Sequence, residues 1–132
     1  MPALDTNVLV RWLTRDDEAQ YAVAGRKLAA ARQQGLSLWV APTVLLELEW
    51  VLRSRYRVSR VAMAATFDAL LQVHELSFGE EVAVERALWR FKRDDAPDFA
   101  DCLHASLAEG AGQGPLLTFD ARAATMPGAQ AI

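Results

Sequence analysis

The chain opens with an apolar run that stops at Asp5, followed by a polar pair and a second apolar run. This order predicts a strand, a tight turn and a short helix over residues 8–13. A carboxylate at the end of a buried strand lies at the carboxyl edge of a sheet, where open α/β folds bind their ligands. Asp5 is also a favoured N-cap for the helix after it, so a functional role and a capping role are both open.

Apolar and polar runs continue to alternate along the chain. Gly35 is expected to end one helix, Pro42 to begin the next, and Ser59 to cap another. Strands that alternate with helices imply an α/β fold, with a mostly parallel sheet covered on both faces. The expected helices cover residues 19–34, 42–56, 61–71, 80–91 and 97–108, the expected strands cover 36–41, 73–76 and 115–119, residues 121–124 form a helical turn, and residues 126–132 could add an edge strand.

Composition narrows the class of protein. The 132 residues, 52% of them hydrophobic and 23% charged, predict a single globular domain over residues 1–132. The formal charge of −3 does not favour nucleic-acid binding by itself, although clustered arginines and a bound cation can reverse the local field. One cysteine, Cys102, allows no intrachain disulfide and favours a reducing compartment, so we expect a cytoplasmic protein. We expect neither a membrane span nor a signal peptide.

Asp120 resembles Asp5 in its setting, because it also ends an apolar run. Both carboxylates should therefore emerge at the same edge of the sheet, and they would face each other if their strands are neighbours. The alternative is that Asp120 only begins the short turn that follows it.

Glu47 and Glu49 lie in a helix that is apolar nearly all round. At about 100° per residue they point about 200° apart, so they do not share a face. A carboxylate on a buried helix is costly unless a metal or a facing cation satisfies it. Arg53 follows Glu49 by four positions and can pair with it, which leaves Glu47 as the candidate ligand.

Asp98 and Asp101 are three positions apart, which places both on one face of the predicted helix 97–108. Asp98 has an ordinary explanation, because an acid in the first helical turn interacts well with the helix dipole. Asp101 is one turn deeper and is harder to explain in this way. His104 is near the same edge but is more simply a surface residue, and Cys102 is expected to be a small buried residue.

Several carboxylates gathered at one sheet edge would repel one another, and some would take up protons. Divalent cations remove this conflict. A set of oxygen ligands with no cysteine or histidine cluster favours Mg²⁺ or Mn²⁺ over zinc. Such a site suits phosphoryl chemistry, in which an ion activates water and a second ion can stabilise the leaving oxygen.

Four motifs together resemble the PIN-domain ribonucleases, and more narrowly the VapC-type toxins of toxin–antitoxin pairs. The motifs occur in this order and cover nearly the whole chain: Leu4-Asp5-Thr6-Asn7-Val8-Leu9, Glu47-Leu48-Glu49-Trp50-Val51-Leu52, Asp98-Phe99-Ala100-Asp101 and Leu117-Thr118-Phe119-Asp120. Each motif alone has little specificity, and the specificity comes from their order and spacing.

The resemblance implies a three-layer α/β/α sandwich with a parallel sheet of about five strands. It implies that Asp5, Glu47, Asp101 and Asp120 hold Mg²⁺ or Mn²⁺, with Asp98 as an additional acidic ligand and with Asn7 and Thr118 as supporting polar residues. The implied reaction is endonucleolytic hydrolysis of single-stranded RNA. The implied partners are a cognate antitoxin and a second copy of the chain in a homodimer. The tail departs from the family pattern, since residues 126–132 offer little of a final strand.

Because the net charge is negative, RNA would have to approach along arginines. The candidates are Arg11, Arg15, Arg53, Arg55, Arg57 and Arg93, although any one of them is more simply a solvated or helix-end charge.

Other classes of function stay open. A phosphatase with an aspartyl nucleophile would use a second aspartate two residues after Asp5, where this chain has Asn7. The sequence is also compatible with a non-catalytic PIN-like binding module and with a free-standing RNA-processing nuclease that has no antitoxin.

Overall fold

A computed structural model describes all 132 residues of the chain. The chain divides into two compact units, Met1–Gly79 and Glu80–Ile132, which are described separately below.

The first unit contains four helices and two strands. They are α1 (Thr6–Thr14), α2 (Glu18–Gln34), β1 (Leu38–Val40), α3 (Pro42–Arg55), α4 (Arg60–Leu71) and β2 (Leu76–Phe78). Several helix ends follow the sequence signals: Gly35 ends α2 with a positive φ of 65°, Pro42 begins α3, and the Ser59 hydroxyl accepts a hydrogen bond from the Ala62 amide. The helices predicted in this unit are therefore confirmed to within a few residues.

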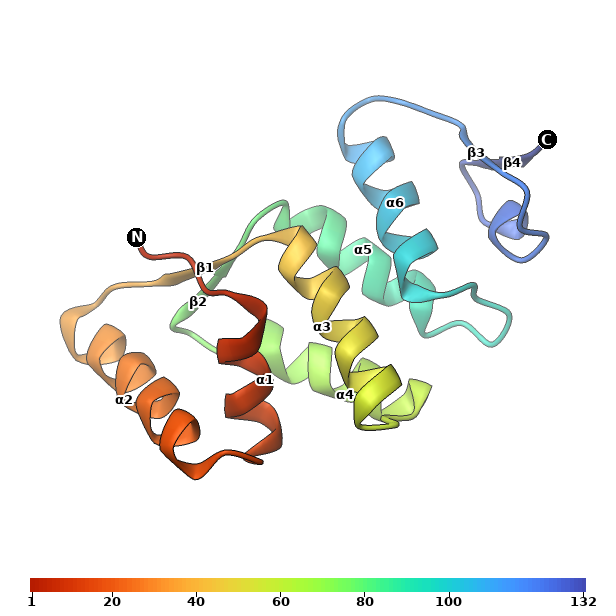
Figure 1. Cartoon of the computed structure of the whole chain (residues 1–132). Coiled ribbons are helices and arrows are strands. Elements are labelled where there is room, and N and C mark those ends of the chain that lie inside the picture. The colour runs from red at the N-terminus through yellow and green to blue at the C-terminus, as the bar shows by residue number, and fades with distance from the viewer. The chain divides into compact units, whose positions relative to one another are not determined.

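β1 and β2 lie side by side and form a parallel pair in which Leu38 aligns with Leu76 and Val40 with Phe78 (Figure 1). The opening strand is reduced to one parallel bridge between Ala3 and Trp39, joined by hydrogen bonds from the Leu4 amide to the Trp39 carbonyl (2.8 Å) and from the Trp39 amide to the Pro2 carbonyl (2.7 Å). Leu38 and Val40 are buried while Trp39 between them is exposed, as the two-residue period of a strand requires.

The second unit contains α5 (Glu81–Phe91), α6 (Phe99–Gly110), β3 (Leu116–Thr118), the 3₁₀-helix η1 (Ala123–Thr125) and β4 (Ala129–Ala131). α5 packs against α6, and the rings of Phe91 and Phe99 meet edge to face with centroids 5.6 Å apart. Phe99 is fully buried, so this contact lies at the centre of the unit's core. The tail does form a strand, since β4 pairs with β3 in parallel.

The expected single sheet of about five strands is wrong. The structure has four strands of three residues each, arranged as two separate two-stranded parallel sheets. The predicted strand 73–76 is also displaced, because tight turns continue from α4 through Val73 and pairing starts only at Leu76. Strand pairing joins segments far apart in the chain, so the local apolar pattern could indicate strands without fixing their partners.

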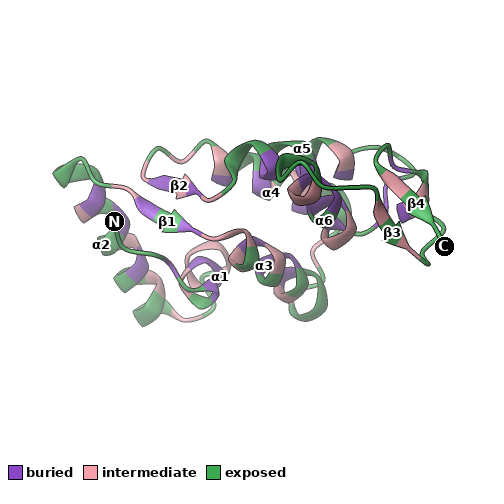
Figure 2. Ribbon diagram, turned by 90° about the horizontal axis from the view of Figure 1, so that it is seen from above, coloured by how far each residue is buried: buried purple, intermediate pink, exposed green.

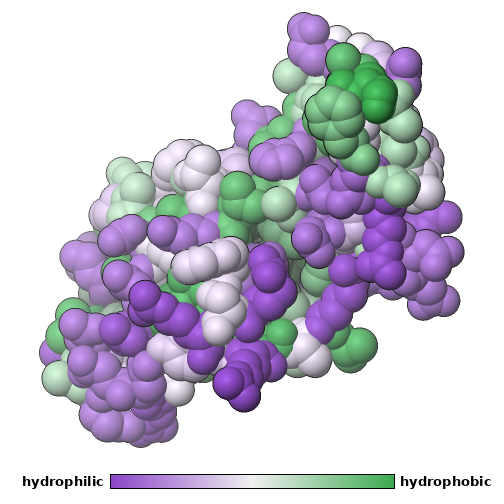
Figure 3. Space-filling view, turned by 45° about the vertical axis from the view of Figure 1, so that its right-hand side comes forward, coloured by the Kyte–Doolittle hydropathy of each residue, from purple (hydrophilic) through white to green (hydrophobic).

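The two sheets differ in how far their residues are buried (Figure 2). Leu76 and Phe78 of β2 are buried, whereas every residue of β3 and β4 is intermediate or exposed. Leu117 and Phe119, which belong to the apolar run of the predicted strand 115–119, are 57% and 88% exposed. Hydrophobic side chains accordingly lie at the surface of this end of the second unit (Figure 3).

Candidate active site

Within the first unit, one buried threonine joins two of the predicted carboxylates. Asp5 precedes α1 and its Oδ1 accepts a hydrogen bond of 2.8 Å from the Thr6 amide. The Thr6 hydroxyl donates to Oε1 of Glu47 on α3. Asp5 therefore caps a helix, as its ordinary explanation required, and it is also held next to the residue that orients Glu47.

The two glutamates of α3 have different roles. The Glu49 carboxylate is almost fully buried and pairs with the Arg53 guanidinium at 2.9 Å. Glu47 is exposed, so the burial expected of the candidate ligand belongs to Glu49 instead. The i,i+4 pairing of Glu49 with Arg53 is confirmed, and Glu47 is the carboxylate left available to a ligand.

Within the second unit, three aspartates interact through space. Burial is the largest influence on Asp101 and raises the pKa of its carboxyl group. The nearby charges of Asp120 and Asp98 raise this pKa further, while His104 acts in the opposite direction. The charges of Asp98 and Asp120 therefore act on Asp101 through space.

Asp98 is positioned at the N-cap of α6, but its side chain makes no cap hydrogen bond. The ordinary explanation for Asp98, a favourable interaction of its charge with the helix dipole, requires no such hydrogen bond and stays open. Pro97 immediately before it is buried.

Asp120 follows β3 and is fixed by its own turn. One carboxylate oxygen accepts hydrogen bonds from the Arg122 amide (2.8 Å) and the Ala123 amide (3.0 Å). The Asp120 amide in turn donates to the Thr118 hydroxyl at 3.0 Å. Thr118 thus supports Asp120 locally, whereas Asn7 lies exposed in the first turn of α1.

In neither unit do three or more Asp, Glu, His or Cys side chains come together in a geometry that could hold a metal ion. The chemistry of the donors nevertheless fits a hard cation, because the candidates are all carboxylates. The raised pKa of Asp101 points the same way, because a bound cation would relieve the repulsion that causes part of it.

Sequence reasoning assigned no role to Thr6. It is 3% exposed and belongs to the core as well as to the site. Its place directly after Asp5 was the only sequence signal, and the hydrogen bond to a residue on another helix was not visible in any local pattern.

The PIN domain family model matches residues 3–129, and the chain belongs to the PIN-domain family. The match spans both units and includes all the candidate carboxylates. A search of curated proteins finds no match.

PIN domains are generally nucleases that bind RNA and use divalent metal ions, usually Mg²⁺ or Mn²⁺.

None of the helices combines the length and the apolar character that spanning a membrane requires.

Proposed function

We propose that this protein is a metal-dependent endoribonuclease that cleaves single-stranded RNA. Asp5, Glu47, Asp101 and Asp120 would supply the catalytic carboxylates, with Asp98 as a further acidic ligand. The observation that carries the proposal is the match of the PIN family to residues 3–129, a stretch that contains all five of these carboxylates. A partly buried carboxylate beside two others is costly as an anion, and a cation bound nearby would offset that cost.

Each residue has a distinct part in this proposal. Asp5, Glu47, Asp101 and Asp120 would hold Mg²⁺ or Mn²⁺, and a divalent ion activates water and stabilises negative charge on a leaving oxygen. Thr6 orients Glu47 by donating a hydrogen bond to its carboxylate. The Arg122 and Ala123 amides fix one oxygen of Asp120. Asn7 and Thr118 would support the site without holding the ion.

The decisive experiment is cleavage of labelled single-stranded RNA with Mg²⁺, with Mn²⁺ and with EDTA. Asp5→Asn and Asp101→Asn should each lower the rate at least about a hundredfold, because even residues that only support metal ligands contribute about 10- to 100-fold. Asparagine at position 5 keeps the helix cap, so a loss would report the lost charge. Glu85→Gln, which removes an exposed acid of α5, is the matched control and should cleave normally.

Equal cleavage by the wild type and the Asp101→Asn variant, persisting after repeated purification, would refute the proposed site. Metal binding without cleavage of any RNA would favour the non-catalytic binding module.

We further propose that the protein is the toxin of a toxin–antitoxin pair, acts in the cytoplasm and forms a homodimer. The support is the similarity of its four motifs, in order along nearly the whole chain, to VapC-type toxins. Expression of the wild type should stop growth, and expression of the Asp101→Asn variant should not. Co-expression of a small protein encoded immediately beside the gene should restore growth. Harmless expression of an active nuclease would favour the free-standing RNA-processing enzyme instead.

A further inference from the structure

The positive charge of the second unit is concentrated in one place. Residues 80–132 contain nine acidic and five basic residues, a formal charge of −4. Four of these five basic residues line a single pocket of about 980 Å³: Arg90, Lys92, Arg93 and Arg122. Asp94 and Asp95 are the only acidic residues in its lining. An otherwise acidic unit therefore has one cationic cavity large enough for a nucleotide.

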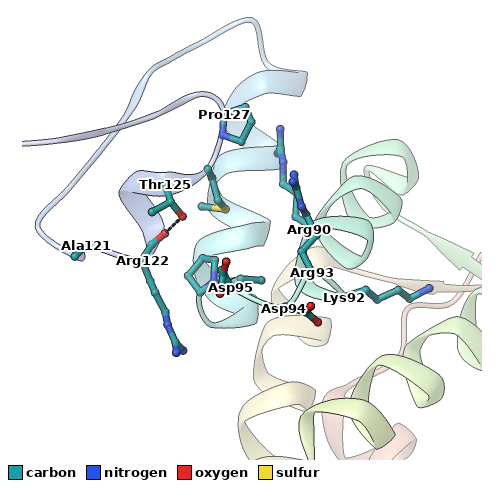
Figure 4. Close-up of a pocket in the computed structure, with 12 residues that line it drawn as sticks. Arg90, Lys92, Arg93, Asp94, Asp95, Ala121, Arg122, Thr125 and Pro127 are labelled. Atoms are coloured by element: carbon teal, nitrogen blue, oxygen red, sulfur yellow. Dashed lines mark hydrogen bonds between the residues drawn. The ribbon is translucent and has the colours of Figure 1, made fainter.

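The four cations are not equivalent (Figure 4). Arg90 is held in the structure, because its guanidinium donates to the Ser106 hydroxyl and to the Glu109 carboxylate, both at 2.7 Å. Lys92 extends away from η1 in this view. Arg93, two residues after α5, and Arg122, the residue before η1, come from opposite walls of the pocket. Arg93 and Arg122 are therefore the cations best placed to contact a bound anion.

An exposed aromatic ring lies beside this pocket. The Arg93 guanidinium is 5.4 Å from the centroid of the Trp89 ring, and Trp89 is 65% exposed. A cationic groove together with an exposed aromatic ring is the combination that binds single-stranded nucleic acids, since the cations hold phosphates and the ring stacks on a base. An acidic protein segment would use the cations but would have no need of the ring.

The pocket also adjoins two of the candidate aspartates through the backbone. Pro97 and Ala121 line the pocket, and they are the direct chain neighbours of Asp98 and Asp120. The Arg122 amide donates to the Asp120 carboxylate at 2.8 Å. A strand held in the pocket would therefore pass next to these carboxylates.

We propose that this pocket binds single-stranded RNA, with Arg93 and Arg122 on its phosphates and Trp89 stacked on a neighbouring base. The inference rests on the proposed ribonuclease function and assigns its substrate-binding residues. Of the six arginines considered for a wider RNA path, only Arg93 lines this pocket, whereas Arg11, Arg15 and Arg53 form ion pairs with Asp16, Glu18 and Glu49.

The test measures equilibrium binding of a labelled single-stranded RNA of about 12 nucleotides to the full chain in EDTA, over a range of salt concentrations. The double variant Arg93→Gln, Arg122→Gln should bind about tenfold or more weakly. The slope of log K against log salt should fall by about 1.4, since each phosphate contact on a single strand contributes about 0.7. Trp89→Ala should weaken binding about tenfold and leave this slope unchanged, because a stacking contact releases no counterion.

Two controls make the result specific. Arg86→Gln removes the one basic residue of the unit that lies outside the pocket lining, so RNA binding should stay within about twofold of wild type. Asp94→Asn with Asp95→Asn removes negative charge from the lining and should tighten binding.

Wild-type affinity and salt slope in the Arg93, Arg122 double variant would overturn the proposal, as would absence of RNA binding by the wild type. Equal affinity for a poly-glutamate peptide would assign the pocket to an acidic protein segment and would also overturn it. Cleavage is measured separately with Mg²⁺, so the two proposals fail in distinguishable ways. If the protein cleaves RNA but the pocket variants bind RNA normally, only the proposal for the pocket is refuted. If RNA binding depends on the pocket but no RNA is cleaved, only the proposed nuclease activity is refuted.

Discussion

The hydroxyl of Thr6 donates a hydrogen bond to the carboxylate of Glu47, 41 residues further along the chain. Through this bond the first turn of α1 determines where a side chain of α3 points. The backbone amide of the same threonine donates to Asp5, so one residue controls two candidate metal ligands.

Replacing Thr6 with valine should clearly change the Mg²⁺ dependence of cleavage but lower the free energy of unfolding only slightly. Valine keeps the shape but removes the donor, which should lower the free energy of unfolding by about 1 kcal/mol. The loss of orientation at Glu47 should raise the Mg²⁺ concentration for half-maximal cleavage about tenfold. Thr6→Ser keeps the hydroxyl and should restore the metal dependence. Unchanged Mg²⁺ dependence in the valine variant would limit Thr6 to a packing role.

Substitutions of the two glutamates of α3 should affect different properties, the cleavage rate for Glu47 and the stability for Glu49. Glu47→Gln should reduce cleavage about a hundredfold or more and leave the denaturation midpoint nearly unchanged, because Glu47 is exposed. Glu49→Gln should cleave normally but lose about 1 to 2 kcal/mol of stability, because its buried carboxylate pairs with Arg53, which is itself half exposed. Chemical denaturation and RNA cleavage on both proteins test this pair, and the reverse pattern would exchange the roles of the two residues.

Asp101 should make the metal-free protein less stable as the pH rises. The pKa of its carboxyl group is raised in the folded state, so between the ordinary value of 3.8 and the raised value the folded chain binds more protons than the unfolded chain. Stability therefore falls as the pH rises through this window, and the full penalty is present at neutral pH. In EDTA, Asp101→Asn should melt at a higher temperature than wild type at pH 7, and the difference should shrink towards pH 3.

A related prediction concerns the effect of Mg²⁺ on the melting temperature. Saturating Mg²⁺ should raise the melting temperature of the wild type at pH 7, because a ligand that binds only the folded state stabilises it. Asp101→Asn should respond much less. If Mg²⁺ stabilised both proteins equally, Asp101 would not be a ligand.

Asp98→Asn distinguishes a helix cap from a metal ligand. Asparagine and aspartate are about equally good N-caps, and the Asp98 carboxylate makes no cap hydrogen bond, so the free energy of unfolding should change by no more than about 0.5 kcal/mol. The Mg²⁺ concentration required for cleavage should nevertheless rise about tenfold if Asp98 is a ligand. Calorimetric titration of both proteins measures the affinity directly, and identical Mg²⁺ affinities would assign Asp98 to the helix terminus alone.

The helices were predictable because their signals are local. Gly35, Pro42 and Ser59 each occupy the cap or first-turn position that the sequence indicated. The pairing of Glu49 with Arg53 followed from helical spacing in the same way.

Features that depend on distant contacts were not predictable. The opening run became a single bridge at Ala3, and no residue of β3 is buried despite its apolar sequence. The hydrogen bond of Thr6 to Glu47 and the pocket between Arg93 and Arg122 both require segments that only the fold brings together. Net charge was also a poor guide, because it averages over a surface whose charges are segregated.

This separation of acidic from basic residues limits where a polyanion can bind to the second unit. Seven of its nine acids lie outside the pocket lining, so most of this surface would repel RNA while the proposed pocket would attract it. A uniformly basic protein would hold RNA in many registers, most of them unproductive. The second unit would attract RNA only weakly overall but would favour one docking position. An RNA strand would therefore sample few wrong alignments before it lies beside Asp98 and Asp120.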